Sequence, residues 1–182
     1  MRSTDSVAGM HRPTVERLTI GLFLAVSVTA FETLAVATVL PTISEKFHGD
    51  RLYGATFVGY MLANLVSLVV AGERADRTGL RRPFLWASAS FTVGLVVAGV
   101  APSMWVILAG RALQGAGTGV FTSLSYVAVR RAYPESRQPR MYAIVSTAWV
   151  LPSLIAPFAA GWLTDRFGWR WVFIGLVPIT LL

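Results

Sequence analysis

The sequence predicts an all-α membrane protein, a bundle of apolar helices, and three observations lead to this class. Hydrophobic residues make up 54% of the 182 residues and charged ones only 14%, against about 25% charged residues in a typical soluble domain. Uncharged or nearly uncharged stretches of about 20 residues, the length that crosses a bilayer core, recur along the chain. The loops between these stretches are short, so none of them can hold a soluble domain.

Five complete spans are expected from these stretches, followed by an incomplete sixth. The five cover residues 18–40, 52–71, 84–101, 105–129 and 141–164, and the sixth covers residues 171–182. Residues 1–17 are expected to form a cytoplasmic N-terminal tail, which leaves residues 18–182 as the membrane domain. A secretory signal is not expected, because its apolar core is about 7 to 15 residues long and the first stretch is longer.

Basic residues concentrate in alternate loops. The net charge is +7, which would fit a nucleic-acid-binding protein if the charges shared one surface. Instead, eleven arginines lie before the first span, between spans two and three, and between spans four and five: Arg2, Arg12, Arg17, Arg74, Arg77, Arg81, Arg82, Arg130, Arg131, Arg137 and Arg140. The opposite loops hold Lys46, Arg51, Arg166 and Arg170. This alternation is the positive-inside pattern, which predicts a cytoplasmic N-terminus and no nucleic-acid partner.

A short motif occurs twice at a constant offset. Residues 72–79 and residues 161–168 both follow the pattern GxxxDRxG, 89 residues apart. Three spans separate the copies, so they are expected on opposite sides of the membrane, as in the inverted three-plus-three repeats of many secondary transporters. The alternative is that both are ordinary glycine-rich helix ends followed by charged turns.

Only two ionisable side chains lie deep within the expected spans, Glu32 in the first and Arg111 in the fourth. A charge at the centre of a membrane helix costs at least about 2.5 kcal/mol, so such residues nearly always face a bundle interior or a wet cavity. Glu32 is a candidate for binding and releasing a proton, and Arg111 for holding an anionic group. The alternative for both is a static ion pair that fixes helix packing.

Polar residues recur at helical spacing in four spans and predict faces that avoid lipid. The strongest candidates for lining a substrate cavity are Tyr60, Asn64, Gln114 and Trp149. An aromatic and amide lining of this kind suits bulky, partly apolar compounds. The alternative is hydrogen bonding between helices. In the fifth span, Pro152 and Pro157 each remove a backbone donor and favour a kink.

Four motifs occur in order along the chain, at residues 31–41, 72–82, 108–117 and 156–161. Together they resemble motifs of the N-terminal half of the major facilitator superfamily, and within it the bacterial drug:proton antiporters with fourteen helices. The resemblance implies a six-helix half of a major facilitator fold, with its sixth helix truncated. Whether the whole protein has twelve or fourteen helices stays open.

The resemblance also implies a role for each motif. Residues of the second motif, Gly72, Asp76, Arg77, Gly79 and Arg81, are expected to act in a conformational latch. Glu32 and Arg111 are expected to act in proton or cation coupling. Pro157 and Gly161 are the expected residues of the helix-five motif.

The motifs depart from the family pattern at five positions, one of which, Glu32 in place of Asp, is a conservative change. Arg74 stands where relatives usually have an apolar residue, and Leu80 where they usually have a basic one. The ion pairs around Asp76 are therefore expected to differ from those of the relatives. Ala156 and Ala160 replace glycines of the helix-five motif, which weakens the antiporter assignment.

The function expected from these features is secondary active transport, with efflux of a small amphipathic compound or drug in exchange for protons. The alternatives are an importer or uniporter on the same fold, and a non-transporting sensor or assembly protein. An enzyme is not expected, because no paired histidines, cysteines or carboxylates occur in the spans. Expected partners are the lipid bilayer of a bacterial cell membrane, a small-molecule substrate and the missing C-terminal half. The proton gradient would supply energy, with no cofactor or metal.

Overall fold

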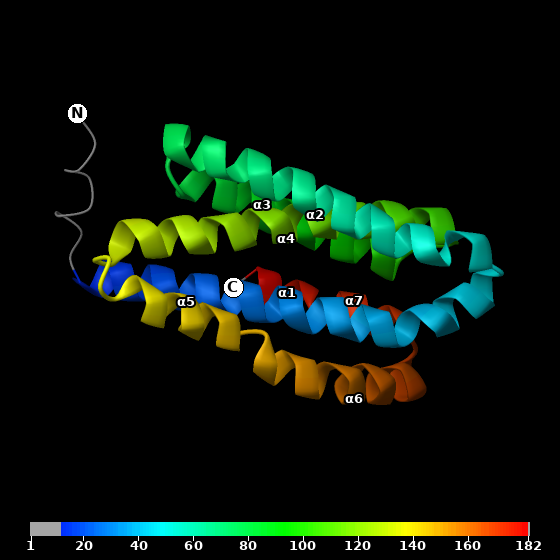
Figure 1. Ribbon diagram of the computed structural model, residues 1–182. Coiled ribbons are helices and arrows are strands. Elements are labelled where there is room, and N and C mark those ends of the chain that lie inside the picture. Colours follow the sequence, from blue (N-terminus) through cyan, green and yellow to red (C-terminus); the bar gives the residue numbers. More distant parts are fainter. Residues whose placement is uncertain (1–11, 182) are drawn as a thin grey trace.

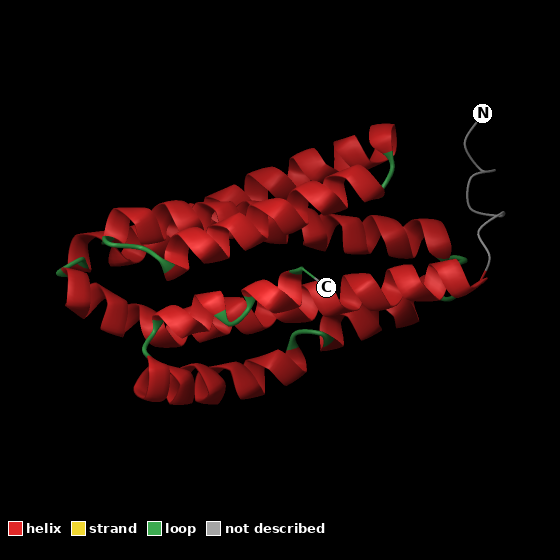
Figure 2. Cartoon of the chain, turned by 180° about the vertical axis from the view of Figure 1, so that it is seen from behind, coloured by secondary structure: helices red, strands yellow, loops and turns green. Residues whose placement is uncertain are grey.

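The computed structural model describes residues 12–181, and every regular element among them is a helix (Figures 1 and 2). The order is α1 (Arg12–Phe47), α2 (Asp50–Thr78), α3 (Arg81–Gly99), α4 (Met104–Ala132), α5 (Gln138–Thr147), α6 (Val150–Phe167), α7 (Arg170–Ile174) and α8 (Val177–Thr180). The predicted all-α class is confirmed. Most of the expected N-terminal tail lies outside the described residues, and its last part, residues 12–17, already belongs to α1.

Helix α1 is longer than its apolar stretch because it continues through Pro41, where a loop was expected to begin. A proline within a helix leaves the carbonyl four residues earlier without its backbone donor, which membrane helices tolerate when neighbouring groups compensate. The chain then turns at His48, which has a positive φ of 48°. Next to it, the Gly49 amide donates to the Ser44 carbonyl at 2.9 Å. The loop expected over residues 41–51 is therefore a two-residue link, His48 and Gly49.

The span expected over residues 141–164 is two helices, α5 and α6, which are separated at Ala148 and Trp149. Pro152 has no amide hydrogen to donate to the Ala148 carbonyl, so the α-helical ladder is interrupted. The break is bridged by shorter turns, in which the Ala148 and Trp149 amides donate three residues back at 3.2 Å. Pro157 lies inside α6 without a comparable interruption.

Three segments in the described part of the chain have both the length and the hydropathy of a membrane span. They are Phe23–Phe47, Asp50–Thr78 and Gln138–Phe167, the last joining α5 and α6. Helix α3 is short and begins with two arginines, and α4 has Arg111 and many small or polar residues in its middle. That these two helices also cross the membrane stays a prediction.

Helix α4 packs tightly between α2 and α3 because its faces are lined with glycine. A Cβ atom on Gly115 or Gly119 would collide with the backbone of α2, at Tyr60 and Asn64 respectively. On the other face, a Cβ on Gly117 would lie 2.7 Å from the Ala87 carbonyl oxygen of α3. Small residues allow this close approach of helix backbones. A second group, α1 with α6 and α7, meets α4 through a core that includes Leu40, Phe91, Ile107 and Phe173.

The two copies of the repeated motif end their helices in the same way. Gly79 after α2 and Gly168 after α6 have positive φ values of 78° and 91°. Their amides donate to the carbonyls of Ala75 and Thr164, four residues earlier, at 3.1 and 2.9 Å. In Figure 1, α2 ends at the left end of the bundle and α6 at the right end. The motif copies therefore have the opposite orientation that an inverted repeat requires.

The arginine-rich segments gather at one end of the bundle. The start of α1, the turn between α2 and α3 and the link between α4 and α5 all lie at the left in Figure 1. The ends of α1 and α6 and the start of α2, which include Lys46, Arg166 and Arg51, lie at the right. The structure thus separates the basic loops in space, as the alternation along the sequence predicts.

Candidate functional site: a buried charge cluster between helices α1, α2 and α4

Glu32 on α1 and Arg111 on α4 are 79 positions apart in the sequence and form a direct ion pair in the bundle interior. Their exposed fractions are 0% and 1%, so both charges are removed from solvent and lipid. The same guanidinium nitrogen, Nη1 of Arg111, also donates to Oε1 of Gln114 at 2.8 Å. Gln114 lies one turn further along α4 and is itself fully buried. The two charges and the amide form one polar cluster.

Tyr60 on α2 completes the cluster from a third helix. The centre of the Arg111 guanidinium lies 4.1 Å from the centroid of the Tyr60 ring. This geometry gives a cation–π attraction, which is strongest where the cation is desolvated. The Tyr60 hydroxyl shares a hydrogen bond of 2.9 Å with the Thr33 hydroxyl on α1. Tyr60 therefore contacts the cation directly and joins it to the helix that holds Glu32.

The glycines of α4 bring Tyr60 against Arg111. Gly115 is four residues after Arg111, on the same face of α4, and any larger side chain there would strike the Tyr60 carbonyl oxygen. Without this glycine, α2 would lie further from α4, and the Tyr60 ring could not reach the guanidinium. Gly115 lies within the motif at residues 108–117, but nothing in the sequence indicated its effect on the charge cluster.

Two atoms of the cluster have no hydrogen-bond partner among the described residues, Oε2 of Glu32 and Nε2 of Gln114. Both lie fully inside the bundle. Oε2 is the carboxylate oxygen that can accept a proton or a hydrogen bond without first displacing Arg111. A buried charged pair is costly to desolvate, so a change in the protonation of Glu32 would strongly alter the balance of forces between α1 and α4. Among the described residues, no three His, Asp or Glu side chains come together as a metal site requires.

The four residues predicted to line a cavity are divided between two places. Tyr60 and Gln114 belong to the charge cluster. Asn64 is half-buried one turn further along α2, where its carbonyl accepts a hydrogen bond from the Ser67 hydroxyl at 3.0 Å. Trp149 is 42% exposed and lies at the break between α5 and α6.

Trp149 lines a separate pocket of about 260 Å³ between α1, α4 and α5. The remaining lining residues are Val26, Thr122, Ser125, Tyr126, Val145 and Ser146. Two aromatic rings and several hydroxyl groups thus share one pocket that has no charged lining residue. Among these lining residues, only Trp149 was one of the strongest candidates from the sequence, and Tyr126 was missed.

The residues of the predicted latch lie at the arginine-rich end of the bundle. The Asp76 carboxylate on α2 accepts a hydrogen bond of 2.6 Å from Arg131 at the end of α4, and Arg130 lies 3.9 Å away. Arg131 also donates to the Ala75 carbonyl at 3.3 Å. These two partners of Asp76 were not predicted, because only the packing of α2 against α4 brings them together.

The other latch residues have no such partner. Among the described ion pairs, none includes Arg77 or Arg81. Gly72 faces Ser123 of α4, whose hydroxyl oxygen would lie 3.5 Å from a Cβ at that position. Gly79 supplies the positive φ that ends α2.

The helix-five residues lie on α6. Pro157 is partly buried within the helix, and no atom lies within 4 Å of the Cβ position of Gly161. Gly161 therefore makes no close contact with another helix within the described residues. The buried small residues of α6 are Ala156 and Ala160.

Comparison with protein families matches residues 22–182 to the Major Facilitator Superfamily. A multidrug resistance protein B homolog of Mycobacterium tuberculosis is 31% identical over 174 residues, which are 91% of this chain and 32% of that protein. A probable multidrug-efflux transporter of the same organism is 31% identical over 185 residues, 100% of this chain and 39% of that protein. The chain thus spans about a third of the length of these relatives.

The fold of this chain is also similar to that of solved transporter structures. A crystal structure of a mutant of the peptide transporter POT, in complex with alafosfalin, superposes with a TM-score of 0.74 over 90% of this chain and 36% of that one. The sequence identity is 19%, so the similarity concerns the fold alone.

Proposed function

Because the chain belongs to the Major Facilitator Superfamily, and is therefore a membrane transporter of that family, we propose that it exports small amphipathic compounds in exchange for protons. Two of the relatives are named for multidrug resistance and multidrug efflux, which supports export of foreign compounds. The chain spans only about a third of each relative, so the complete transporter would include further helices of the same polypeptide.

The observation that carries the proposal is the buried pair of Glu32 and Arg111 between α1 and α4. A transporter that uses a proton gradient needs an acid that is shielded from bulk water in one state and reached by protons in another. Glu32 is the only acid within the helix centres of the described residues, and its Oε2 is not engaged by any of them. A proton on this oxygen would cancel the negative charge that holds Arg111.

The neighbours of Arg111 determine where its guanidinium lies once Glu32 is protonated. The guanidinium would keep its hydrogen bond to Gln114 and its contact with the Tyr60 ring, so it would remain on the side of α2 and α4. The attraction between α1 and α4 would weaken, because neutral Glu32 no longer provides an opposite charge. We propose that this loosening of α1 from α4 couples proton binding to the change between inward-open and outward-open states.

The pocket lined by Tyr126 and Trp149 supports an amphipathic substrate. Aromatic rings offer apolar surface, and the hydroxyl groups of Thr122, Ser125 and Ser146 offer hydrogen bonds. At about 260 Å³, the pocket is slightly smaller than typical small-molecule sites of about 300 to 1,000 Å³. We propose that it forms one side of the substrate cavity, and that the missing half of the polypeptide forms the other.

The proposed orientation has the N-terminus and the arginine-rich end in the cytoplasm of a bacterial cell. The gathering of the basic loops at one end of the bundle supports it, because positively charged loops are retained on the cytoplasmic side. At that end, Gly72, Asp76, Arg77, Gly79 and Arg81 would form the latch that holds one conformational state. The contact of Asp76 with Arg131 supports this role.

Transport by the full-length protein in proteoliposomes with an imposed pH gradient tests the proposal. We expect Glu32→Gln to abolish proton-driven efflux, because the amide cannot take up a proton, while the protein still inserts into the membrane. Glu45→Gln is the matched control, since Glu45 is an exposed acid on the same helix, and it should leave efflux unchanged. Efflux by Glu32→Gln at the rate of the unmodified protein would contradict the proton role. Uptake of substrate down the same proton gradient would indicate the importer instead.

A further inference from the structure

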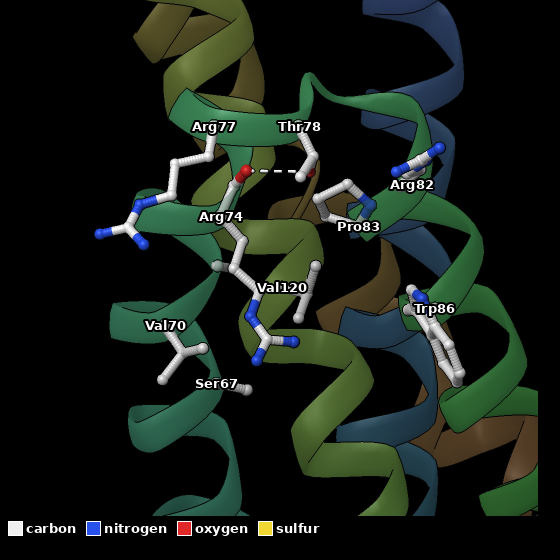
Figure 3. A pocket seen from close by; sticks show the side chains of 10 residues that line it. Ser67, Val70, Arg74, Arg77, Thr78, Arg82, Pro83, Trp86 and Val120 are labelled. Carbon is white, nitrogen blue, oxygen red and sulfur yellow. Dashed lines mark hydrogen bonds between the residues drawn. The ribbon is translucent and has the colours of Figure 1, made fainter.

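A second pocket, of about 410 Å³, opens at the arginine-rich end of the bundle, where α2 ends and α3 begins. Its lining residues come from α2, α3 and α4, and Figure 3 shows them from close by. They are Ser67, Val70, Ala71, Arg74, Arg77, Thr78, Arg82, Pro83, Trp86 and Val120. The lining thus combines three arginines with an apolar floor, and it contains no carboxylate.

The three arginines of this pocket have no ion-pair partner in the described part of the chain. Asp76, the acid beside Arg77 in the sequence, is instead paired with Arg131 and Arg130 at the end of α4. The positive charge in the pocket is therefore not neutralised by an acid among the described residues. Guanidinium groups without a carboxylate, beside apolar surface, favour binding of an anion from outside.

The Arg74 side chain lies along the pocket rather than pointing away from the helix end. Figure 3 shows it running from the last turns of α2 back toward Ser67 and Val120, whereas the Arg77 guanidinium points away from them. Side chains on a helix lean toward its N-terminus, and here that direction leads from the basic end toward the apolar middle of the bundle. Arg74 thus brings a cation to the boundary between the charged loops and the apolar helix surface.

Trp86 forms the opposite wall of the pocket, on α3. Its side chain is 76% exposed, and tryptophan is enriched where a membrane protein meets the headgroup layer. Val70 on α2 and Val120 on α4 add further apolar surface to the lining. The pocket therefore offers cations for a headgroup and an apolar wall for the start of the acyl chains.

We propose that this pocket binds the phosphodiester headgroup of an anionic phospholipid from the cytoplasmic leaflet, with Arg74 holding the phosphate. Basic pockets between membrane helices on the cytoplasmic side suit such headgroups, and arginine binds phosphate through two parallel hydrogen bonds. A free phosphate ion has the same charge chemistry but gains nothing from Trp86 and Val120. The inference rests on the membrane orientation in the proposed function, and it does not require proton coupling.

Lipid retention by the full-length protein tests this inference. The protein is purified in detergent, incubated with an equimolar mixture of phosphatidylglycerol and phosphatidylcholine, and analysed for bound lipid by native mass spectrometry. We expect phosphatidylglycerol to be retained selectively, and Arg74→Gln to reduce its retention by about fivefold, the effect of losing one cation at a membrane surface. Arg140→Gln is the matched control, because Arg140 is an exposed arginine of the same end that does not line the pocket. It should change retention by less than about twofold, since the pocket keeps all its cations.

Other outcomes would overturn the inference. Equal retention of the two lipids, or an unchanged retention in Arg74→Gln, would mean that the pocket does not select an anionic headgroup. Displacement of phosphatidylglycerol by millimolar inorganic phosphate would assign the pocket to a free anion. Because lipid retention is measured without substrate or a pH gradient, these results are independent of the efflux measurements on Glu32→Gln. A far-UV circular dichroism spectrum and an SDS unfolding curve equal to those of the unmodified protein verify that Arg74→Gln is folded.

Discussion

Arg111 makes three different contacts in the bundle interior, and only one of them is with a group of opposite charge. Its guanidinium bonds to Glu32, donates to Gln114 and lies over the Tyr60 ring. The ring and the amide are neutral, so Glu32 alone balances the buried positive charge. Removing either charge leaves the other uncompensated in the bundle interior, which is more costly than removing both.

The first prediction comes from this charge balance. Arg111→Met should lower the free energy of unfolding by about 3 to 5 kcal/mol, because it leaves the Glu32 carboxylate buried without a cation. The double variant Glu32→Met with Arg111→Met should recover most of that loss, since no buried charge remains. Unfolding by SDS titration in mixed micelles measures both values. If the double variant is as unstable as the single one, the pair is not the source of the effect.

The second prediction concerns the contact of Gly115 with α2. Gly115→Ala places a methyl group against the Tyr60 carbonyl oxygen, and overpacking of this kind costs about 1 to 3 kcal/mol. Because the helices must move apart, transport should fall as well. Gly54→Ala is the control, since nothing lies within 4 Å of its Cβ position, and alanine there should be neutral or stabilising. A loss of stability in both variants would argue for a general effect of replacing glycine.

At the scale of the helix, hydropathy predicted where apolar segments lie but not where helices end. The spans over residues 18–40 and 52–71 were expected to end with their apolar stretches, yet α1 and α2 extend to Phe47 and Thr78. A helix ends where its backbone finds other partners, as at the positive φ of Gly79, and not where it leaves the bilayer. The residues that end these helices are close together in the sequence, so the GxxxDRxG pattern could indicate both helix ends.

The contacts between helices were less accessible to sequence reasoning. Glu32 and Arg111 were singled out because a charge is rare in an apolar span, and the structure brings them together. By contrast, Arg130 and Arg131 were seen only as topology signals, since nothing local indicates that Asp76 is their neighbour. The contact of Tyr60 with Arg111 was missed for the same reason, because it depends on how closely α2 approaches α4.

The third prediction belongs to the break between α5 and α6. Pro152→Ala restores a donor for the Ala148 carbonyl, so the two helices should join. Amide hydrogen exchange over residues 148–151 should then slow by roughly fivefold or more, the effect of about one net hydrogen bond. Pro157→Ala lies in an uninterrupted part of α6 and should leave exchange at these residues unchanged. Unchanged exchange in Pro152→Ala would mean that packing around Trp149, and not the proline, maintains the break.

At the scale of the whole molecule, the first repeat (helices α1 to α3) and the second repeat (the helices from α4 onward) share more than the GxxxDRxG motif. Helix α2 packs on α4, and its counterpart, α5 with α6, packs on α1 through α6. The contact of α2 with α4 thus corresponds to the contact of α6 with α1 when the two repeats are exchanged. A pseudo-two-fold relation between the repeats requires this correspondence. The charge pair joins α1 and α4, the first helices of the two repeats. A change in this pair therefore acts where the two repeats meet.

The last prediction concerns Asp76, which joins the end of α2 to the end of α4. The Asp76 side chain is 56% exposed, and that of its partner Arg131 is 32% exposed, so the pair contributes at most about 1 kcal/mol to stability. Asp76→Asn should therefore hardly change the SDS unfolding curve. Its effect on transport should be larger. If the pair forms in only one of the inward-open and outward-open states, losing about 1 kcal/mol changes the ratio of the two populations about fivefold. We expect proton-driven efflux to change several-fold in Asp76→Asn, and not in the control Glu73→Gln, an exposed acid three residues away on α2. Equal transport by both variants would show that the contact of Asp76 with Arg131 only fixes the helix end and does not act as a latch.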